Sequence, residues 1–147
     1  MTYAIDMHIH ADADPRVIQG RAKEFHDAAL KYFGAKHKHQ SVDETADMYR
    51  KLDMMAVLLA VNSESGIGTC VTNDFVAAAQ HKNPDVFIGF ASVDPWAGGK
   101  ATDDVKRAIE ELGLKGFKFH PATQNFYPNE KQFYPIYEAI ARYSVPI

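Results

Sequence analysis

Apolar and polar positions along the chain recur with two different periods, and each period predicts one kind of element. Short apolar runs predict strands at 4–10, 54–61, 85–93 and 114–120. The run at 54–61 carries no polar residue, which is typical of a strand covered on both faces. Between these runs, apolar residues at helical spacing predict helices over 15–33, 42–53, 74–82, 103–112 and 133–143, and a further strand begins at 145.

Several of the predicted helices begin with residues that suit the free amides of a helix N-terminus. Ser41 and Glu44 form a capping-box pattern, in which each side chain binds the backbone amide of the other residue. We expect Asn73 and Thr102 to cap the next two helices. Pro135 would lie in the first turn of the last helix, where proline is tolerated.

The alternation of strands and helices indicates an α/β chain with a parallel sheet. From the second strand on, strands begin about 30 residues apart, the length of one βαβ step. A complete (β/α)₈ barrel needs about 250 residues, whereas the chain has 147. We therefore predict a parallel (β/α) barrel of the TIM type of which about the first half is present, with four βα units and the start of a fifth strand. An open doubly wound sheet is the alternative, since it can be complete at this length.

Residues 1–147 would then be the N-terminal part of a single barrel domain, with a helical insertion at about 11–40. The chain stops at Val145-Pro146-Ile147, which reads as the beginning of an apolar strand. We therefore expect this sequence to be a fragment. A half-barrel would leave open strand edges, and a homodimer is one way to cover them.

Composition excludes some classes of partner. The formal charge is -3, so we expect neither nucleic acid nor a membrane surface as a partner. No apolar run approaches the roughly 20 residues that cross a bilayer. The single cysteine, Cys70, cannot form an internal disulfide and fits a reducing, cytoplasmic compartment.

The first strand carries polar residues in an otherwise apolar run. Because side chains alternate across a strand, Asp6, His8 and His10 are expected on one face, pointing into the barrel. The two histidines would lie nearest the carboxyl end of the strand, where barrel active sites lie. Two imidazoles at this spacing can bind one divalent ion, and Asp6 would orient one of them. Two core histidines satisfied by hydrogen bonds are the alternative.

A second His-x-His pattern and the fourth strand test this reasoning. Residues 36–39, "KHKH", lie in a polar loop, and we interpret these histidines as solvated. In the fourth strand, Lys118 and His120 are expected to share the inward face. They would anchor a substrate carboxylate, transfer a proton or bind metal, unless the register differs and Lys118 reaches solvent.

The sequence patterns around the other candidate residues favour ordinary structural roles for them. Cys70 has no histidine beside it, and Asp94 precedes Pro95 in a turn pattern. The stretch "SGIG" lacks the spacing of a phosphate-binding loop. Five aromatic residues could line a pocket for an aromatic substrate, but packing is the default for them: Trp96, Phe126, Tyr127, Phe133 and Tyr134. His26 and His81 are expected on helix surfaces.

The motifs together resemble the N-terminal half of metal-dependent amidohydrolase-related TIM-barrel proteins, in the branch that includes aminocarboxymuconate-semialdehyde decarboxylase. The resemblance covers nearly the whole chain and rests on "IDMHIH", "KLDMMAVLLAV", "FIGFASVDP" and "GLKGFKFHP…FYPNEKQFYPIYEAIARYSVPI". It implies that His8 and His10 bind one divalent metal, usually zinc. It places a third histidine ligand at the end of the fifth strand, where this chain stops. Because this branch is usually mononuclear, it also implies that Lys118 and His120 are pocket residues.

The resemblance implies a metal-dependent hydrolase or nonoxidative decarboxylase for a small carboxylated or carbonyl substrate, aromatic ones included. One alternative is that this chain is an inert or merely metal-binding fragment, because half of the site is missing. A second alternative is a histidinol-phosphatase-like phosphoesterase. Such enzymes share Asp-x-His-x-His but usually have Ser or Thr where Ala11 stands.

Overall fold

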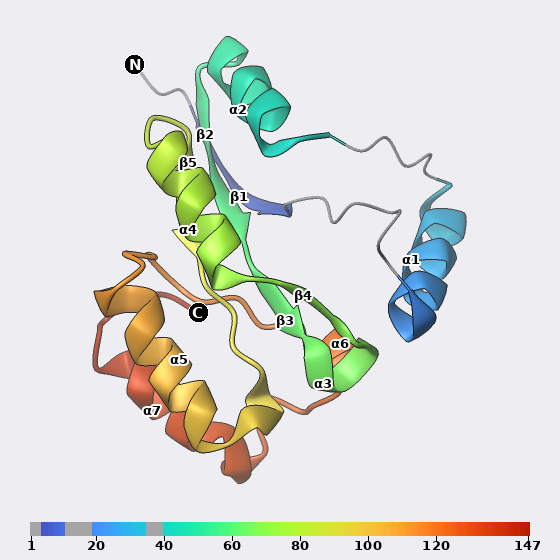
Figure 1. The fold of residues 1–147 in the computed structure, drawn as a ribbon, viewed down its shortest axis with the longest axis vertical. Helices are drawn as coiled ribbons and strands as arrows, with labels where there is room; N and C mark the ends of the chain where they lie inside the picture. Colours follow the sequence, from blue (N-terminus) through green and yellow to red (C-terminus); the bar gives the residue numbers. More distant parts are fainter. Residues whose placement is uncertain (1–3, 11–18, 35–39) are drawn as a thin grey trace.

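The computed structural model describes residues 4–10, 19–34 and 40–147. Its strands and helices alternate along most of the chain, as the sequence predicts (Figure 1). The strands are β1 (Ala4–His10), β2 (Met54–Leu59), β3 (Val61–Ser63), β4 (Thr69–Val71) and β5 (Phe87–Phe90). The helices are α1 (Gly20–Phe33), α2 (Val42–Lys51), α3 (Glu64–Ile67), α4 (Asn73–Lys82), α5 (Gly99–Glu110), α6 (Pro121–Gln124) and α7 (Tyr134–Ala141), with 3₁₀ turns at Pro95–Ala97 and Lys131–Phe133.

The sheet is parallel and follows the order of the chain, which is the arrangement of successive units in a barrel. β1 pairs with β2, and β2 pairs with β5. The predicted fourth strand continues the sheet through an isolated parallel bridge between Ala91 and Phe117. The amide of Lys118 donates to the carbonyl of Ala91 at 2.7 Å, and the amide of Phe117 donates to the carbonyl of Pro146 at 3.0 Å. The segment at 145–147 therefore lies next to the fourth strand, as expected for a fifth.

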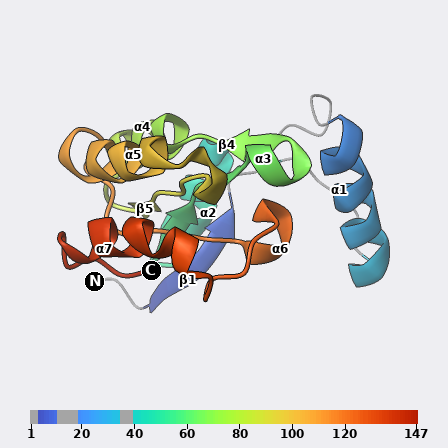
Figure 2. The same cartoon turned by 90° about the horizontal axis from the view of Figure 1, so that it is seen from below.

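One face of the sheet packs against helices and forms the core. Ala56, Leu58 and Ala60 point to this face and are almost completely buried. α2 contacts β2, α4 contacts β2 and β5, and α5 packs beside α7 (Figures 1 and 2). Further core residues from these helices include Ala46, Tyr49, Val76, Val105, Ala108, Ile136 and Ile140. The continuous apolar run that predicted β2 is therefore buried, as expected.

β1 is much more exposed than its sequence predicts. Ile5 is 47% exposed and Met7 is 62% exposed, although both belong to the apolar run that predicted the strand. The reason is that β1 lies at the edge of the sheet and, among the described residues, pairs only with β2. Val57 and Leu59 on the neighbouring strand are nevertheless buried.

The region between β2 and α4, for which the sequence patterns predict neither a strand nor a helix, contains regular structure. β3 and β4 form a short antiparallel hairpin around α3. α3 packs against α6, and Gly66 lies so close that an added Cβ would be 1.9 Å from the carbonyl oxygen of Thr123. This contact connects the segment after β2 to the segment after the fourth strand.

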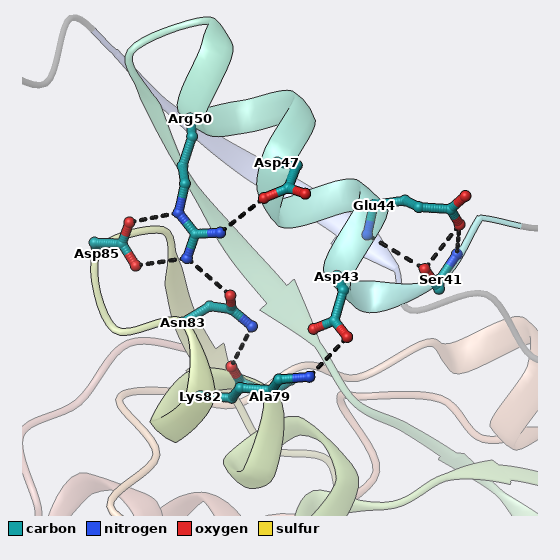
Figure 3. A network of polar contacts seen from close by, with 9 residues as sticks. All are labelled: Ser41, Asp43, Glu44, Asp47, Arg50, Ala79, Lys82, Asn83 and Asp85. Atoms are coloured by element: carbon teal, nitrogen blue, oxygen red, sulfur yellow. Dashed lines mark hydrogen bonds and ion pairs between the residues drawn. The ribbon is translucent and has the colours of Figure 1, made fainter.

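The predicted helix caps are partly confirmed. Ser41 and Glu44 form the capping box at the start of α2 (Figure 3). The cap of α4 is Thr72, because its hydroxyl accepts from the amide of Phe75, and the expectation for Asn73 is wrong. Thr102 is not a cap either: α5 begins three residues earlier at Gly99, and the Thr102 hydroxyl donates to the Gly99 carbonyl. Both corrections concern only the first turn of a helix.

An arginine network attaches α2 to the connection between α4 and β5 (Figure 3). Arg50 donates from two nitrogens to the Asp85 carboxylate, at 2.7 and 2.9 Å, and from Nη2 to Asn83 at 2.8 Å. Lys82 also donates to Asp43 at 2.7 Å. A bidentate guanidinium–carboxylate pair restricts orientation as well as distance. The position of α2 beside the sheet is therefore well defined.

α1 lies at one side of the molecule, next to α3 (Figures 1 and 2). It covers part of the predicted helix 15–33, whose first residues lie outside the described ranges. The "KHKH" stretch also lies outside the described ranges, so its interpretation as a solvated loop stays a prediction. Within the described part of the chain, none of the helices combines the length and apolar character that a membrane crossing requires.

The close contact at Gly66 predicts a specific sensitivity. We expect Gly66→Ala to lower the free energy of unfolding by about 1–3 kcal/mol, because the methyl group would overlap a backbone carbonyl. Gly99→Ala is the matched control, since no atom lies within 4 Å of an added Cβ there. Urea denaturation of both variants measures the effect. Equal stability of the two variants would contradict the packing of α3 against α6.

Candidate metal and substrate site

A β-bulge in β1 determines which way its polar side chains point. Asp6 pairs with Ala56, but Ile9 pairs with Leu58, so β1 contains one residue more than β2 between these positions. Asp6 therefore points to the helix-facing side together with Ala56. His10 pairs with Leu59 and points to the opposite, inner face. The prediction that Asp6 shares a face with both histidines is wrong, because the bulge breaks the simple alternation.

The two histidines of β1 converge on each other. Nε2 of His8 lies 2.9 Å from Nε2 of His10, and the ring centroids are 4.9 Å apart. Both side chains are exposed at the carboxyl end of the strand. Two imidazole nitrogens on one tetrahedral zinc ion lie roughly 3.3 Å apart for bonds of about 2.0–2.1 Å. The donor type and the spacing therefore fit two ligands of a single divalent ion.

Asp6 lies behind this pair and holds the backbone of His8. Its Oδ1 accepts from the His8 amide at 3.0 Å, and its Oδ2 accepts from the Tyr49 hydroxyl of α2 at 2.6 Å. The hydrogen bond from Tyr49, followed by that from the His8 amide, lowers the pKa of Asp6. Burial, reinforced by Asp6, raises the pKa of Tyr49 to about 12. Tyr49 thus stays a neutral donor and Asp6 a charged acceptor.

Lys118 and His120 follow the isolated bridge between Phe117 and Ala91 of the core. Alternation from Phe117 would put both side chains on the inner face, and this shared face stays a prediction. Both side chains are half-buried. Burial is the main cause that lowers the pKa of His120, and the positive charges of Lys118 and His8 add to it. His120 is therefore within electrostatic reach of both Lys118 and the first strand.

The ring of His120 is held in one orientation. It precedes α6, and its Nδ1 accepts a hydrogen bond from the Thr123 amide at 3.3 Å. A neutral imidazole that accepts at Nδ1 carries its proton on Nε2. His120 therefore presents an N–H donor at Nε2, which disfavours a metal bond at that nitrogen.

A buried glutamine that the sequence analysis missed connects His120 to the neighbouring segments of the chain. Gln124 is 1% exposed, and its Oε1 accepts from the His120 amide at 2.7 Å. Its Nε2 donates to the carbonyls of Asn62 and Val93, at 2.8 and 2.9 Å. Gln124 thus joins the segments that follow β2, β5 and the fourth strand. A Gln in a polar loop gives no sequence signal for such a role, because its partners lie far away along the chain.

The weaker candidates have structural roles in the fold. Asp94 is buried and accepts from the amides of Trp96 and Ser65, both at 3.0 Å. Cys70 is exposed as a residue, but partial burial of its thiol, together with the negative charges of Glu64 and Asp94, raises the pKa of the thiol and lowers its reactivity. The "SGIG" stretch forms the last three residues of α3 and its C-cap, Gly68. His81 is exposed on α4 as expected, whereas His26 on α1 is half-buried beside Asp27.

Three of the five aromatic candidates pack on one another, as the default given in the sequence analysis predicts, whereas Tyr127 and Tyr134 are exposed. Phe133 contacts both Trp96 and Phe126, with ring centroids 5.2 and 5.1 Å apart. Phe126 also contacts Phe119, which lies on the helix-facing side of the fourth strand. An aromatic side chain on the inner face was missed by the sequence analysis. Phe90 pairs with Leu59 there, and its ring occupies the space where a Cβ of Gly116 would lie.

Comparison with protein families identifies the chain. A family model described as amidohydrolase matches residues 5–147. The chain belongs to the amidohydrolase family. Its membership confirms the family predicted from the β1 and fourth-strand motifs. A search of curated proteins finds no match.

Solved structures of three amidohydrolase-type enzymes share the fold. They are a 5-carboxyvanillate decarboxylase from Novosphingobium aromaticivorans with bound manganese and a nitrobenzoic acid (20% identity, TM-score 0.61), a 2,6-dihydroxybenzoate decarboxylase from Rhizobium (16%, 0.62) and a 4-oxalomesaconate hydratase from Rhodopseudomonas palustris (19%, 0.60). The matches cover 97%, 99% and 97% of this chain but 48%, 49% and 50% of the respective neighbours. The amidohydrolase chain thus spans about half their length. The prediction of a partial α/β barrel is confirmed.

The residues present can supply part of a metal site. His8 and His10 fit one ion by donor type and spacing. In the described ranges 4–10, 19–34 and 40–147, no group of three or more His, Cys, Asp or Glu side chains gathers as a metal cluster would require. The two imidazoles would therefore share an ion with water or with further ligands.

The environment of His120 predicts a pH dependence. Its pKa is lowered in the fold, so the unfolded chain binds the proton more readily. The free energy of unfolding should therefore fall as pH drops below about 6.5, the ordinary histidine value, and continue to fall through the folded pKa of His120. Ring NMR should give His120 a titration midpoint below about 6.5, the ordinary histidine value. His120→Gln should remove this part of the pH dependence, and a midpoint for His120 at or above about 6.5 would contradict the prediction.

Proposed function

We propose that this chain forms the amino-terminal half of the active site of a metal-dependent decarboxylase or hydrolase. The observation that carries the proposal is the convergence of His8 and His10 at the carboxyl end of β1, on the face of the sheet where Lys118 and His120 are predicted to lie. Family membership and the decarboxylase and hydratase neighbours support this class of reaction. We also propose that residues 1–147 belong to one barrel domain with its helical insertion at about 11–40.

In this proposal His8 and His10 hold one divalent ion. When bound, such an ion acts as a Lewis acid that polarises a carbonyl or carboxylate oxygen. Imidazole nitrogen suits zinc, the ion expected from the sequence, whereas the 5-carboxyvanillate decarboxylase structure contains manganese. Both ions are therefore worth testing.

Lys118 and His120 would bind the substrate. In this proposal the ammonium group of Lys118 and the Nε2–H group of His120 both donate hydrogen bonds toward the inner face. An anionic oxygen of a substrate would accept both of them. A carboxylate on a small substrate supplies such an oxygen. Phe90 and Leu59 provide apolar surface on this face, which suits an aromatic or otherwise planar carbon skeleton. A cytoplasmic location and a homodimer stay predictions.

Metal binding tests the first part of the proposal. Isothermal titration of the purified, chelator-treated protein with Zn²⁺ and Mn²⁺ should show one ion per chain. His8→Ala and His10→Ala should each weaken binding by more than about 100-fold, because each removes a ligand rather than its support. His81→Ala on α4 is the control and should bind as the unchanged protein does. Binding that survives both ligand substitutions would refute the site.

Activity tests the second part. A full-length, metal-loaded protein that contains this half of the site should release CO₂ from, or hydrolyse, a member of a panel of small carboxylic acids that includes 5-carboxyvanillate and 2,6-dihydroxybenzoate. Chelation should abolish this activity and metal should restore it. Lys118→Met should raise KM by at least about tenfold, the effect of losing one charge-assisted contact. Metal binding without any turnover would instead favour the inert, metal-binding fragment.

A further inference from the structure

Tyr49 lies on α2, behind the two candidate ligands, and contacts the strand that carries both of them. It is 6% exposed and lies in the core with Ala46 and Ala56, while its hydroxyl reaches Asp6 at 2.6 Å. Tyrosines in a core need a partner for the hydroxyl, and many find a backbone carbonyl. Here the partner is a carboxylate that is itself bound to the backbone amide of His8.

The bulge explains why this amide needs an acceptor. An extra residue between Asp6 and Ile9 interrupts the regular ladder between β1 and β2. The Asp6 carboxylate accepts from the His8 amide at 3.0 Å at this interruption. By stabilising the bulge, Asp6 keeps itself on the helix-facing side and His8 on the inner face. Without the bulge, simple alternation would put Asp6 on the inner face with the histidines.

The helix that carries Tyr49 is fixed independently. Arg50, the next residue, forms the bidentate pair with Asp85 and the bond to Asn83 (Figure 3). The Tyr49 hydroxyl is therefore held at one place relative to the sheet. β1 is otherwise an exposed edge strand, so an anchor on its covered side matters more here than for a central strand.

We propose that Tyr49 is a positioning residue for the two-histidine site, because through the Asp6 carboxylate it fixes the bulge of β1 and so the direction of His8. This inference rests on the proposed function of His8 and His10 as metal ligands. The ligand whose binding Tyr49 supports is a divalent cation. Tyr49 touches neither the ion nor a substrate.

The test compares two tyrosines that each donate to a carboxylate. Tyr49→Phe removes the hydrogen bond to Asp6, and Tyr143→Phe removes a bond of 2.7 Å to Glu110 on α5, on another side of the fold. Titration of the chelator-treated variants with Zn²⁺ or Mn²⁺ should show an affinity about tenfold lower for Tyr49→Phe. Tyr143→Phe should bind within about twofold of the unchanged protein.

A double-mutant cycle separates positioning from general destabilisation. Asp6→Ala should weaken metal binding at least as much as Tyr49→Phe, and Tyr49→Phe should add nothing further in the Asp6→Ala background, because the two act through one connection. Ile140→Ala, which destabilises the fold by removing a fully buried side chain of α7, should leave metal affinity unchanged. If Ile140→Ala weakens binding as much as Tyr49→Phe, the effect is one of stability and the inference is overturned.

Outcomes for this inference and for the proposed function can be told apart. If the unchanged protein binds neither ion, the proposed function of the histidines fails and the positioning role fails with it. If it binds and Tyr49→Phe binds equally well, only the positioning role fails. Hydrogen exchange of the His8 amide gives a metal-free check for a variant that folds poorly. Exchange should be faster in Tyr49→Phe than in Tyr143→Phe, and equal rates would overturn the inference.

Discussion

At the bulge of β1, the backbone amide of His8 donates to a side chain of its own strand. The carboxylate of Asp6 accepts from the His8 amide on the covered side of the strand, and the Tyr49 hydroxyl binds the same carboxylate. An aspartate in an exposed edge strand would normally be free to rotate into solvent. Held between an amide and a buried hydroxyl, it instead stabilises the one conformation of β1 that brings Nε2 of His8 beside Nε2 of His10.

The other half of the candidate site is held by buried amide hydrogen bonds rather than by charge. Gln124 uses its oxygen and its nitrogen to join the ends of three neighbouring segments, and one of these contacts is the backbone of His120. Leaving such buried groups without partners would cost about 1–3 kcal/mol each. The hydrogen bonds of Gln124 thus support the segment in which the ring of His120 is held as an Nε2 donor. The close approach at Gly66 keeps α3 against α6.

These two supports fit the way in which a barrel builds a site from successive strands. Each strand contributes one or two side chains at its carboxyl end, and the helix-facing side of the sheet fixes their directions. Membership of the amidohydrolase family agrees with this arrangement, and the solved neighbours extend over about twice the length of this chain. The family match and the solved neighbours establish the family and the fold of this chain. The metal, the substrate and the reaction are proposals.

The sequence by itself determined the α/β class, the order of the main elements and the candidate residues His8, His10, Lys118 and His120. These features follow from local periodicity and residue type, which short stretches such as 54–61 or 114–120 contain completely. Only the tertiary structure decided the rest. The bulge, which puts the side chain of Asp6 on the helix-facing side, depends on the pairing of β1 with Ala56 and Leu58. The roles of Tyr49 and Gln124 depend on partners that lie 43 and up to 62 positions away along the chain. No local pattern encodes such contacts, because they exist only after the chain has folded.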